Sequence, residues 1–491
     1  MEKVFNALDG LINYAVNNLE LAAKNVDYVR NGLLRILNID TYCPPSDAVY
    51  CTETRPEKPL NALLDACMEK GLVSEDERAA IADEVMGELS LSPKEVDDKF
   101  NLLMKEVGSK AATEWFYDYS VKNDYVKRTQ LDKNPRFDSE GLIITINKAK
   151  PEFRDAKKAA SGNNVKGGYP KCTICHENEG FAGRNKRTLR TVDIELGGEK
   201  WFWQFSPYGY FYQHGIVVNY AHIPMHVDKN TFTRLMDFVD KFPHYFIGSN
   251  AALERIGGSV LAHDHYQGGG EILPMHKAKA AYTLTSKKYP DVVVEVVDWA
   301  NTVVRIVSKN RKAIEEIGDA VREKWTRYED REKGIIPRTE KGQHHAVSPT
   351  VVKTDRGYEM NIIFRSNITS EEYPDGIFHA HPEFHIIKKE SIGLIEAQGL
   401  FILPGRLEKE LGEVEDLIVQ GKPLTEELKE FGLVYKEIKE ICGGDISKES
   451  VHSAVKKELG SVCNRILENT AVFKDKKDTV EFMREMGFEL C

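Results

Sequence analysis

The spacing of apolar residues divides the chain into a helical beginning, a strand-rich middle and a helical end. Through the first 40 residues, apolar side chains recur every three or four positions, as at Leu8, Leu11 and Ile12, which is typical of an amphipathic helix. Helical spacing returns in the last part of the chain. We therefore predict a helical N-terminal region at residues 1–140 and a helical C-terminal tail at residues 408–491.

The middle of the chain alternates short β-rich runs with one helix in each of two stretches, residues 141–290 and 291–407. Runs of β-branched and aromatic residues bounded by glycine predict strands and hairpins. Each stretch carries a His-x-His sequence that we expect on a strand, His263-Asp264-His265 in the first and His379-Ala380-His381 in the second. The repeated order predicts an α+β fold in which a diverged duplication produces two related halves.

Composition and charge narrow the class of protein. The chain has 491 residues, and no apolar run approaches the ~20 residues that a membrane span needs. A net charge of −10 argues against a nucleic-acid-binding protein, which would normally be basic. The first residues lack the basic segment and apolar stretch of a secretory signal. We expect a cytoplasmic protein with no membrane partner and no nucleic-acid partner.

Histidines are concentrated in the middle of the chain, where thirteen of the fourteen lie within residues 176–385. On a strand, His263 and His265 would face one site, and a neutral imidazole is a suitable nucleophile for phosphoryl or nucleotidyl transfer. Gln267 would share that face, and Gly257-Gly258-Ser259 lets the backbone approach a phosphate. A histidine pair with only structural hydrogen bonds is the alternative. The neighbouring Gly-Gly-Ser sequence and Gln267 favour catalysis.

Two of the eight cysteines, Cys172 and Cys175, have the spacing at which both thiolates reach one tetrahedral metal ion. Because no second Cys-x-x-Cys exists, the remaining ligands would be histidines from elsewhere in the chain. A pair of reduced thiols and a redox pair are the alternatives. The glycine-rich sequence before Cys172 indicates a loop rather than the strand of a thioredoxin-like site, which favours the metal.

Two further groups of residues leave their role open. The stretch from Gly183 to Arg190 is basic within an acidic protein, so it either neutralises a diphosphate or is a solvated run of charges. The second histidine cluster, at His379 and His381, is a metal site, a sugar-phosphate site or a relic of the first motif. The spacing alone does not decide between these functions.

Several of these stretches resemble one family, the galactose-1-phosphate uridylyltransferases, and within it the longer bacterial class II. The stretches that carry the resemblance are Cys172-Thr-Ile-Cys-His-Glu-Asn-Glu-Gly-Phe-Ala-Gly-Arg184, Trp203-Gln-Phe-Ser-Pro-Tyr208, His222-Ile-Pro-Met225, Phe242 to Asn250, Gly257 to Gly269, Tyr373 to Pro382, and Ile392 to Leu407. The opening helix at Phe5 to Tyr14 is also similar, so the resemblance covers nearly the full chain. It implies two histidine-triad-like halves that form a curved antiparallel sheet, with helical additions at both ends.

The resemblance also implies a role for each motif residue. His265 matches the nucleophile that forms a uridylyl-histidine intermediate, and Gln267 matches the glutamine that contacts the transferred phosphoryl group. Arg184 would stabilise the charge on the phosphate. The residues that resemble the nucleotide-binding segment are Asn250, Gly258 and Ser259. The residues that match the ligands of a structural zinc ion are Cys172, Cys175, His222 and His263.

The activity implied is the ping-pong exchange of a uridylyl group between UDP-glucose and galactose 1-phosphate, carried out by a homodimer with zinc and no organic cofactor. One alternative keeps His265 but uses another sugar nucleotide, as a related nucleotidyltransferase, phosphorylase or hydrolase of the histidine-triad type. Another is a catalytically silent nucleotide-binding or zinc-structured scaffold. The intact pair of His265 and Gln267 counts against the scaffold.

Overall fold

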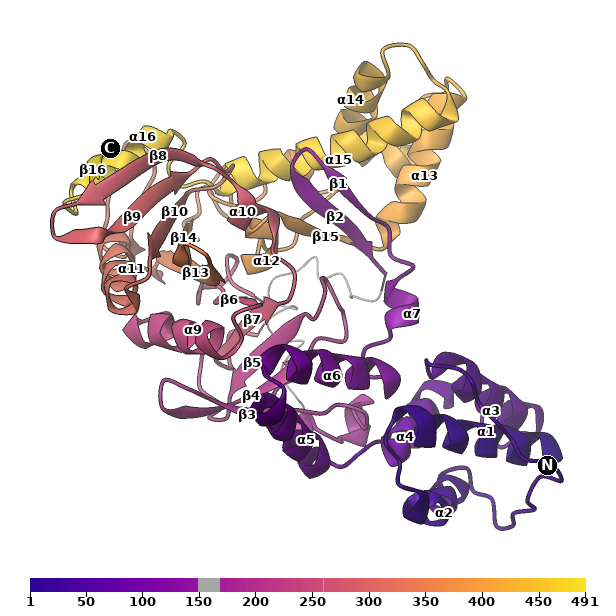
Figure 1. Ribbon diagram of the computed structural model, residues 1–491. Coiled ribbons are helices and arrows are strands. Elements are labelled where there is room, and N and C mark those ends of the chain that lie inside the picture. The colour runs from indigo at the N-terminus through magenta and orange to yellow at the C-terminus, as the bar shows by residue number, and fades with distance from the viewer. Residues whose placement is uncertain (149–167, 259) are drawn as a thin grey trace.

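The computed structural model describes residues 1–148, 168–258 and 260–491, and its main feature is one antiparallel sheet of 11 strands (Figure 1). The strands lie in the order β16-β8-β9-β10-β14-β13-β6-β7-β5-β4-β3. Their bounds are β3 (Val192–Leu196), β4 (Glu199–Phe205), β5 (Gly215–Asn219), β6 (Phe246–Gly248), β7 (His265–Gly269), β8 (Ala280–Ser286), β9 (Tyr289–Val297), β10 (Val303–Ser308), β13 (His345–Thr354), β14 (Gly357–Ser366) and β16 (Glu489–Leu490). With helices at both ends of the chain, the predicted α+β class is confirmed.

Two groups of strands repeat the same arrangement within this sheet. The first runs β3, β4, β5, α9 (Lys229–Lys241), β6, β7, and the second runs β8, β9, β10, α11 (Arg311–Trp325), β13, β14. In the sheet they lie as β3-β4-β5-β7-β6 and β8-β9-β10-β14-β13, so each strand has a counterpart across the contact between β6 and β13. The fold therefore contains the two related halves that the sequence predicts.

One face of the sheet forms the main hydrophobic core with α9 and α11, which lie side by side (Figure 1). Trp203 is fully buried there, with its ring centroid 5.5 Å from that of Phe238 in α9. Alternate residues of a strand point to opposite faces. Tyr266 therefore packs in this core beside Trp201, whereas Gln204 and His265 point to the other face, where the candidate site lies.

The N-terminal helices extend from the first half of the sheet (Figure 1). They are α1 (Glu2–Asn18), α2 (Val26–Ile36), α3 (Glu57–Glu69), α4 (Arg78–Leu89), α5 (Pro93–Glu106), α6 (Ser109–Lys122) and α7 (Arg128–Leu131). The side chain of Ser92 caps α5 by accepting from the backbone N–H of Glu95, whose carboxylate accepts from the Ser92 N–H at 2.8 Å. Phe100 of α5 packs edge-on against Trp203, which attaches these helices to the core.

A smaller sheet connects the middle of the chain to the C-terminal helices. Its strands are β1 (Arg136–Ser139), β2 (Leu142–Asn147) and β15 (Leu400–Pro404), and β2 pairs in parallel with β15. The helices that follow are α13 (Arg406–Val419), α14 (Gly432–Cys442), α15 (Lys448–Thr470) and α16 (Lys476–Arg484), and shorter elements are α10 (Pro274–Lys277), β11 (Arg338–Thr339), β12 (Gly342–Gln343) and α12 (Leu394–Ala397). The strand β2, predicted within the first half, thus belongs to this separate sheet, and residue 290 falls inside β9.

The second His-x-His sequence is not on a strand, and of the first only His265 is, so the prediction that both sequences lie on strands was wrong. His379-Ala380-His381 lies in the connection that follows β14, and β14 itself occupies the sheet position that β7 occupies in the first half. The Nε2 atom of His381 bonds to the carbonyl oxygen of Ile377 at 3.1 Å, which anchors a loop. None of the helices in the described ranges is long and apolar enough to cross a membrane.

Candidate active site and metal centre

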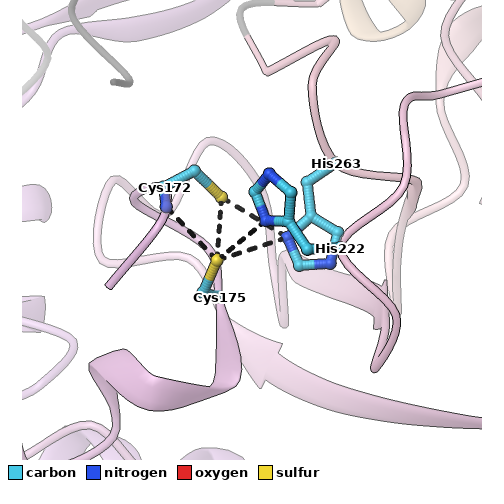
Figure 2. A group of neighbouring side chains, drawn as sticks. All are labelled: Cys172, Cys175, His222 and His263. Carbon is cyan, nitrogen blue, oxygen red and sulfur yellow. Dashed lines mark hydrogen bonds between the residues drawn. The ribbon is translucent and has the colours of Figure 1, made fainter. Parts of the chain in front are cut away.

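Four side chains from three separate stretches meet beside the beginning of β7 (Figure 2). The Cys172 and Cys175 sulfurs are 3.3 Å apart, and the Cys172 sulfur is 3.4 Å from Nδ1 of His263. The Cys175 sulfur is 3.1 Å from Nδ1 of His222 and 3.7 Å from Nδ1 of His263. Within the described residues, this is the one group of histidine, cysteine and acidic side chains arranged to hold a metal ion.

Backbone contacts orient these four side chains. The side-chain amide of Asn178 donates to the carbonyl oxygens of Cys172 at 2.8 Å and Cys175 at 2.9 Å, which closes the cysteine loop. Nε2 of His263 lies 2.7 Å from the carbonyl oxygen of Asn219 at the end of β5. Because a carbonyl only accepts, Nε2 carries the proton and Nδ1 presents its lone pair to the cluster, as a metal-ligating histidine requires.

The donor set fits a tetrahedral zinc ion. Zinc about 2.3 Å from each sulfur and about 2.0 Å from each nitrogen separates neighbouring ligand atoms by roughly 3.3–3.8 Å. Four of the six observed separations run from 3.1 to 3.7 Å, and all six lie within 4.8 Å. Two thiolates and two imidazoles would fill the shell and leave no position for a substrate, which is the pattern of a structural site.

His265 is the first residue of β7 and lies two residues after the candidate ligand His263. Its Nδ1 donates to the carbonyl oxygen of His263 at 2.8 Å, so Nε2 keeps its lone pair. The side chain is buried, and burial lowers the pKa of His265 to about 4, against a smaller opposing effect of that hydrogen bond. The imidazole is therefore neutral near pH 7, with its free nitrogen able to act as a nucleophile.

Gln267 lies on the same face of β7, two residues after His265, and is partly buried. Its Oε1 is 3.1 Å from Nε2 of His214. Within the described ranges its amide nitrogen has no hydrogen-bond partner, so it is available to an acceptor that enters the site. The structure thus brings Gln267 and His265 together as the sequence predicts.

The segment between β6 and β7 packs against the second half through Asn250. Its Oδ1 accepts from the backbone N–H of Leu394 in α12 at 2.8 Å. A Cβ atom on Gly258 would come within 2.7 Å of the Asn250 amide nitrogen, so a larger residue there would displace the Asn250 amide. Asn250 and Gly258 therefore lie in contact, whereas the predicted Ser259 lies outside the described residues.

The basic stretch from Gly183 to Arg190 divides into two parts. Arg187 pairs with Glu84 at 3.1 Å and Arg190 donates to the carbonyl oxygen of Leu91 at 2.6 Å, so both bind the N-terminal helices. Arg184 has a buried Nη1 without a hydrogen-bond partner in the part of the chain that the structure describes. A hydrogen bond with Cys175 is the main effect that lowers the pKa of Cys172 to about 7, and the charge of Arg184 adds to it.

The second histidine cluster lies outside the candidate metal centre, and three residues that the sequence did not predict support the site. His379 and His381 belong to no group of metal-ligating side chains in the described residues. Sequence reasoning missed Asn178, Asn219 and His214, which hold the predicted residues in place. No local signal indicated His214, because its partner Gln267 is 53 positions away.

Comparisons with known proteins identify the family of this chain. Residues 40–224 match the model of the galactose-1-phosphate uridyl transferase N-terminal domain, and residues 238–431 match that of the C-terminal domain. The galactose-1-phosphate uridylyltransferase of Bifidobacterium longum is 54% identical over 99% of this chain and 99% of its own. That of Clostridium acetobutylicum is 37% identical over 91% of this chain and 92% of its own. The chain therefore belongs to the galactose-1-phosphate uridylyltransferase family, and it is a nucleotidyltransferase.

Among solved structures, the yeast Ap4A phosphorylase Apa2 covers 66% of this chain and 89% of its own, with 12% identity and a TM-score of 0.32. A likeness this weak carries no argument. The description of the fold rests instead on the strand order and the repeated halves.

Proposed function

We propose that this protein exchanges a uridylyl group between UDP-glucose and galactose 1-phosphate by a ping-pong mechanism through His265. The observation that carries the proposal is the hydrogen bond from Nδ1 of His265 to the His263 carbonyl oxygen at 2.8 Å. It leaves the lone pair of Nε2 free on a buried, neutral ring. The names of the relatives indicate galactose 1-phosphate as a substrate. The geometry of His265 supports its role as the nucleophile.

In the first step, the Nε2 lone pair of His265 attacks the α-phosphorus of UDP-glucose. A nitrogen–phosphorus bond forms, the bond to the bridging oxygen breaks, and glucose 1-phosphate leaves with that electron pair. The imidazole then carries a positive charge, which the His263 carbonyl oxygen stabilises through the proton on Nδ1. In the second step, a phosphate oxygen of galactose 1-phosphate attacks the same phosphorus and an oxygen–phosphorus bond forms. The nitrogen–phosphorus bond breaks, its electron pair returns to Nε2, and UDP-galactose leaves a neutral His265.

Two side chains would stabilise the negative charge that spreads over the phosphoryl oxygens. The amide N–H groups of Gln267, which have no partner among the described residues, lie on the face of His265, and donors of this kind act most strongly where water is excluded. Nη1 of Arg184 adds a cationic donor near the cysteine loop. Asn250 and Gly258 would receive the nucleotide.

We propose zinc for the cluster of Cys172, Cys175, His222 and His263, with a structural task. When bound, it would supply a fixed link between the cysteine loop and the start of β7. His263 would connect that link to the backbone carbonyl that orients His265. A homodimer remains our prediction for the assembly, to be checked by light scattering.

Intact-protein mass spectrometry tests the uridylyl-histidine proposal. Protein mixed with UDP-glucose alone should gain the mass of one uridylyl group and lose it when galactose 1-phosphate is added. A hydrolase would release glucose 1-phosphate continuously without an acceptor, and a silent scaffold would show no change. The matched control is His265→Ala, which should remain unmodified. Exchange without any covalent adduct would exclude the ping-pong mechanism.

A further inference from the structure

His214 lies directly before β5 in an aromatic enclosure on the face of the sheet that holds the candidate site. Its ring centroid is 4.4 Å from that of Phe211 and 5.0 Å from that of Tyr210, which stacks on it at an interplanar angle of 25°. Its backbone is held as well, because its carbonyl oxygen accepts from the Ser206 N–H at 2.8 Å. Only 2% of the residue is exposed, so the ring has one defined position.

The hydrogen bonds of His214 indicate which ring nitrogen carries the proton. Nε2 lies 3.1 Å from Oε1 of Gln267, and Nδ1 is buried with no hydrogen-bond partner among the residues that the structure describes. A buried N–H without an acceptor is rarer and more costly than an unpaired lone pair. Burial lowers the pKa of His214 to about 4, so the ring has one proton near pH 7. That proton belongs on Nε2, which donates to Gln267.

We infer that His214 is a positioning residue for Gln267. By holding Oε1, it turns the amide nitrogen of Gln267, which has no partner in the described residues, toward the phosphoryl oxygens of the nucleotide. The inference rests on the proposed function, because it assigns a purpose to a residue that would act on the transferred group.

The physical reason lies in the two ends of a glutamine amide. Its nitrogen attracts a phosphoryl oxygen, whereas its oxygen repels one, and rotation about the last side-chain bond exchanges them. A donor stabilises a transition state best when its orientation is set before the reaction. His214 sets it without adding a charge beside the phosphate.

Three variants at one position separate the donor from the ring. His214→Phe keeps an aromatic side chain in the enclosure but cannot donate, and we expect kcat to fall about 10- to 100-fold with little change in KM. His214→Gln brings an amide N–H near the position of Nε2 and should recover most of that loss. Melting temperatures are measured for each protein, and His214→Leu removes the same donor if the phenylalanine variant does not fold.

A double-mutant cycle shows whether His214 acts through Gln267. In a Gln267→Ala background, His214→Phe should lower kcat by less than about 2-fold further, because the amide that His214 orients is absent. The matched control is His276→Phe in α10, where Nε2 of a buried histidine bonds Oε1 of Gln398 at 2.7 Å; its kcat should stay at the wild-type value.

The rate at which the uridylyl adduct forms from UDP-glucose in a single turnover measures the effect of the same variants on the first step. Wild-type rates in His214→Phe, or a cost that adds fully to that of Gln267→Ala, would overturn the inference. A wild-type protein that forms no adduct would overturn the proposed function, and the inference with it.

Discussion

The two halves of the sheet place different chemistry on the same face. Residues paired across neighbouring strands share a face, and one such row runs from β4 to β9 across the middle of the sheet. The row runs through Gln204, Ile216, Gln267, Gly248, Thr350, Asn361, Arg305 and Glu295. Gln267 and Asn361 hold equivalent places on either side of its middle. Around Gln267 the row is uncharged, whereas around Asn361 it carries buried charges.

The charges of the second half pair with one another. Nη1 of Arg305 lies 3.1 Å from Glu295, its Nε donates to Oδ1 of Asn361 at 2.9 Å, and its Nη2 donates to the Met275 carbonyl oxygen at 2.9 Å. Arg356, from the turn before β14, reaches back to Glu359 at 2.9 Å. No donor of Arg305 is left for a ligand. In the first half, by contrast, Nε2 of His265 and the amide nitrogen of Gln267 have no hydrogen-bond partner within residues 1–148, 168–258 and 260–491.

The connecting segments explain how the same strands came to differ. Residues 249–264 connect β6 to β7, whereas the counterpart connection between β13 and β14 is the tight turn at Asp355 and Arg356. Residues 220–228 connect β5 to α9 and include His222, whereas only residues 309–310 connect β10 to α11. The longer connections supply two of the four candidate metal ligands. The two halves thus share their arrangement of strands, and the loops supply the residues that give the first half its chemistry.

The largest effect should follow loss of His265. His265→Ala removes the nucleophile, and we expect exchange to fall by at least about 10⁴-fold, because loss of a covalent nucleophile leaves only binding and charge stabilisation. The coupled assay of UDP-galactose formation measures it, and free imidazole should restore part of the activity to His265→Gly. Glu359→Gln, two residues before Asn361, is the control and should keep wild-type kcat. Normal turnover by His265→Ala would end the proposed mechanism.

The metal centre gives the second contrast between the halves. Elemental analysis should find close to one zinc ion per chain, because four ligands converge in the first half and no such group exists among the described residues of the second. Cys172→Ser/Cys175→Ser should lose the zinc, and its melting temperature should fall by more than about 5 °C. Cys43→Ser/Cys51→Ser, outside the cluster, is the control that should keep it. A zinc-free wild-type protein with full activity would leave the two cysteines as reduced thiols.

Local sequence patterns predicted the features that depend on a few neighbouring residues. They failed for features that depend on residues far apart in the chain. The Cys-x-x-Cys spacing and the face shared by His265 and Gln267 are properties of a few consecutive residues, so both could be predicted. The pairing of β14 in the place of β7 depends on contacts between strands far apart in the chain. For that reason the His379-Ala380-His381 sequence was wrongly expected on the equivalent strand, although its residues resemble those of the first motif.

The charge network of the second half should support folding rather than catalysis. Arg305→Met leaves Glu295 and Glu359 buried with only Arg356, whose side chain is 46% exposed. Breaking a buried ion pair by removing one partner costs about 3–5 kcal/mol, and we expect the free energy of unfolding to fall by about that amount. Urea denaturation measures this free energy, and Arg356→Met should lower it by a smaller amount. The folded fraction of Arg305→Met should turn over at the wild-type rate; a selective loss of kcat would give this network a role in the reaction.

We expect the smallest of these effects from Gln267 and Asn361, the two amides at equivalent places of the row. Gln267→Ala should lower kcat on the order of 10²-fold, about 2.7 kcal/mol, while KM changes little, because its N–H groups would be used most in the transition state. Asn361→Ala removes the amide on the other side of the row, which bonds Nε of Arg305 and lies 3.2 Å from Nδ1 of His276. It should lower stability and leave kcat unchanged. If both variants lost turnover equally, the two halves would share the chemistry; if Gln267→Ala raised KM alone, the residue would belong to substrate binding.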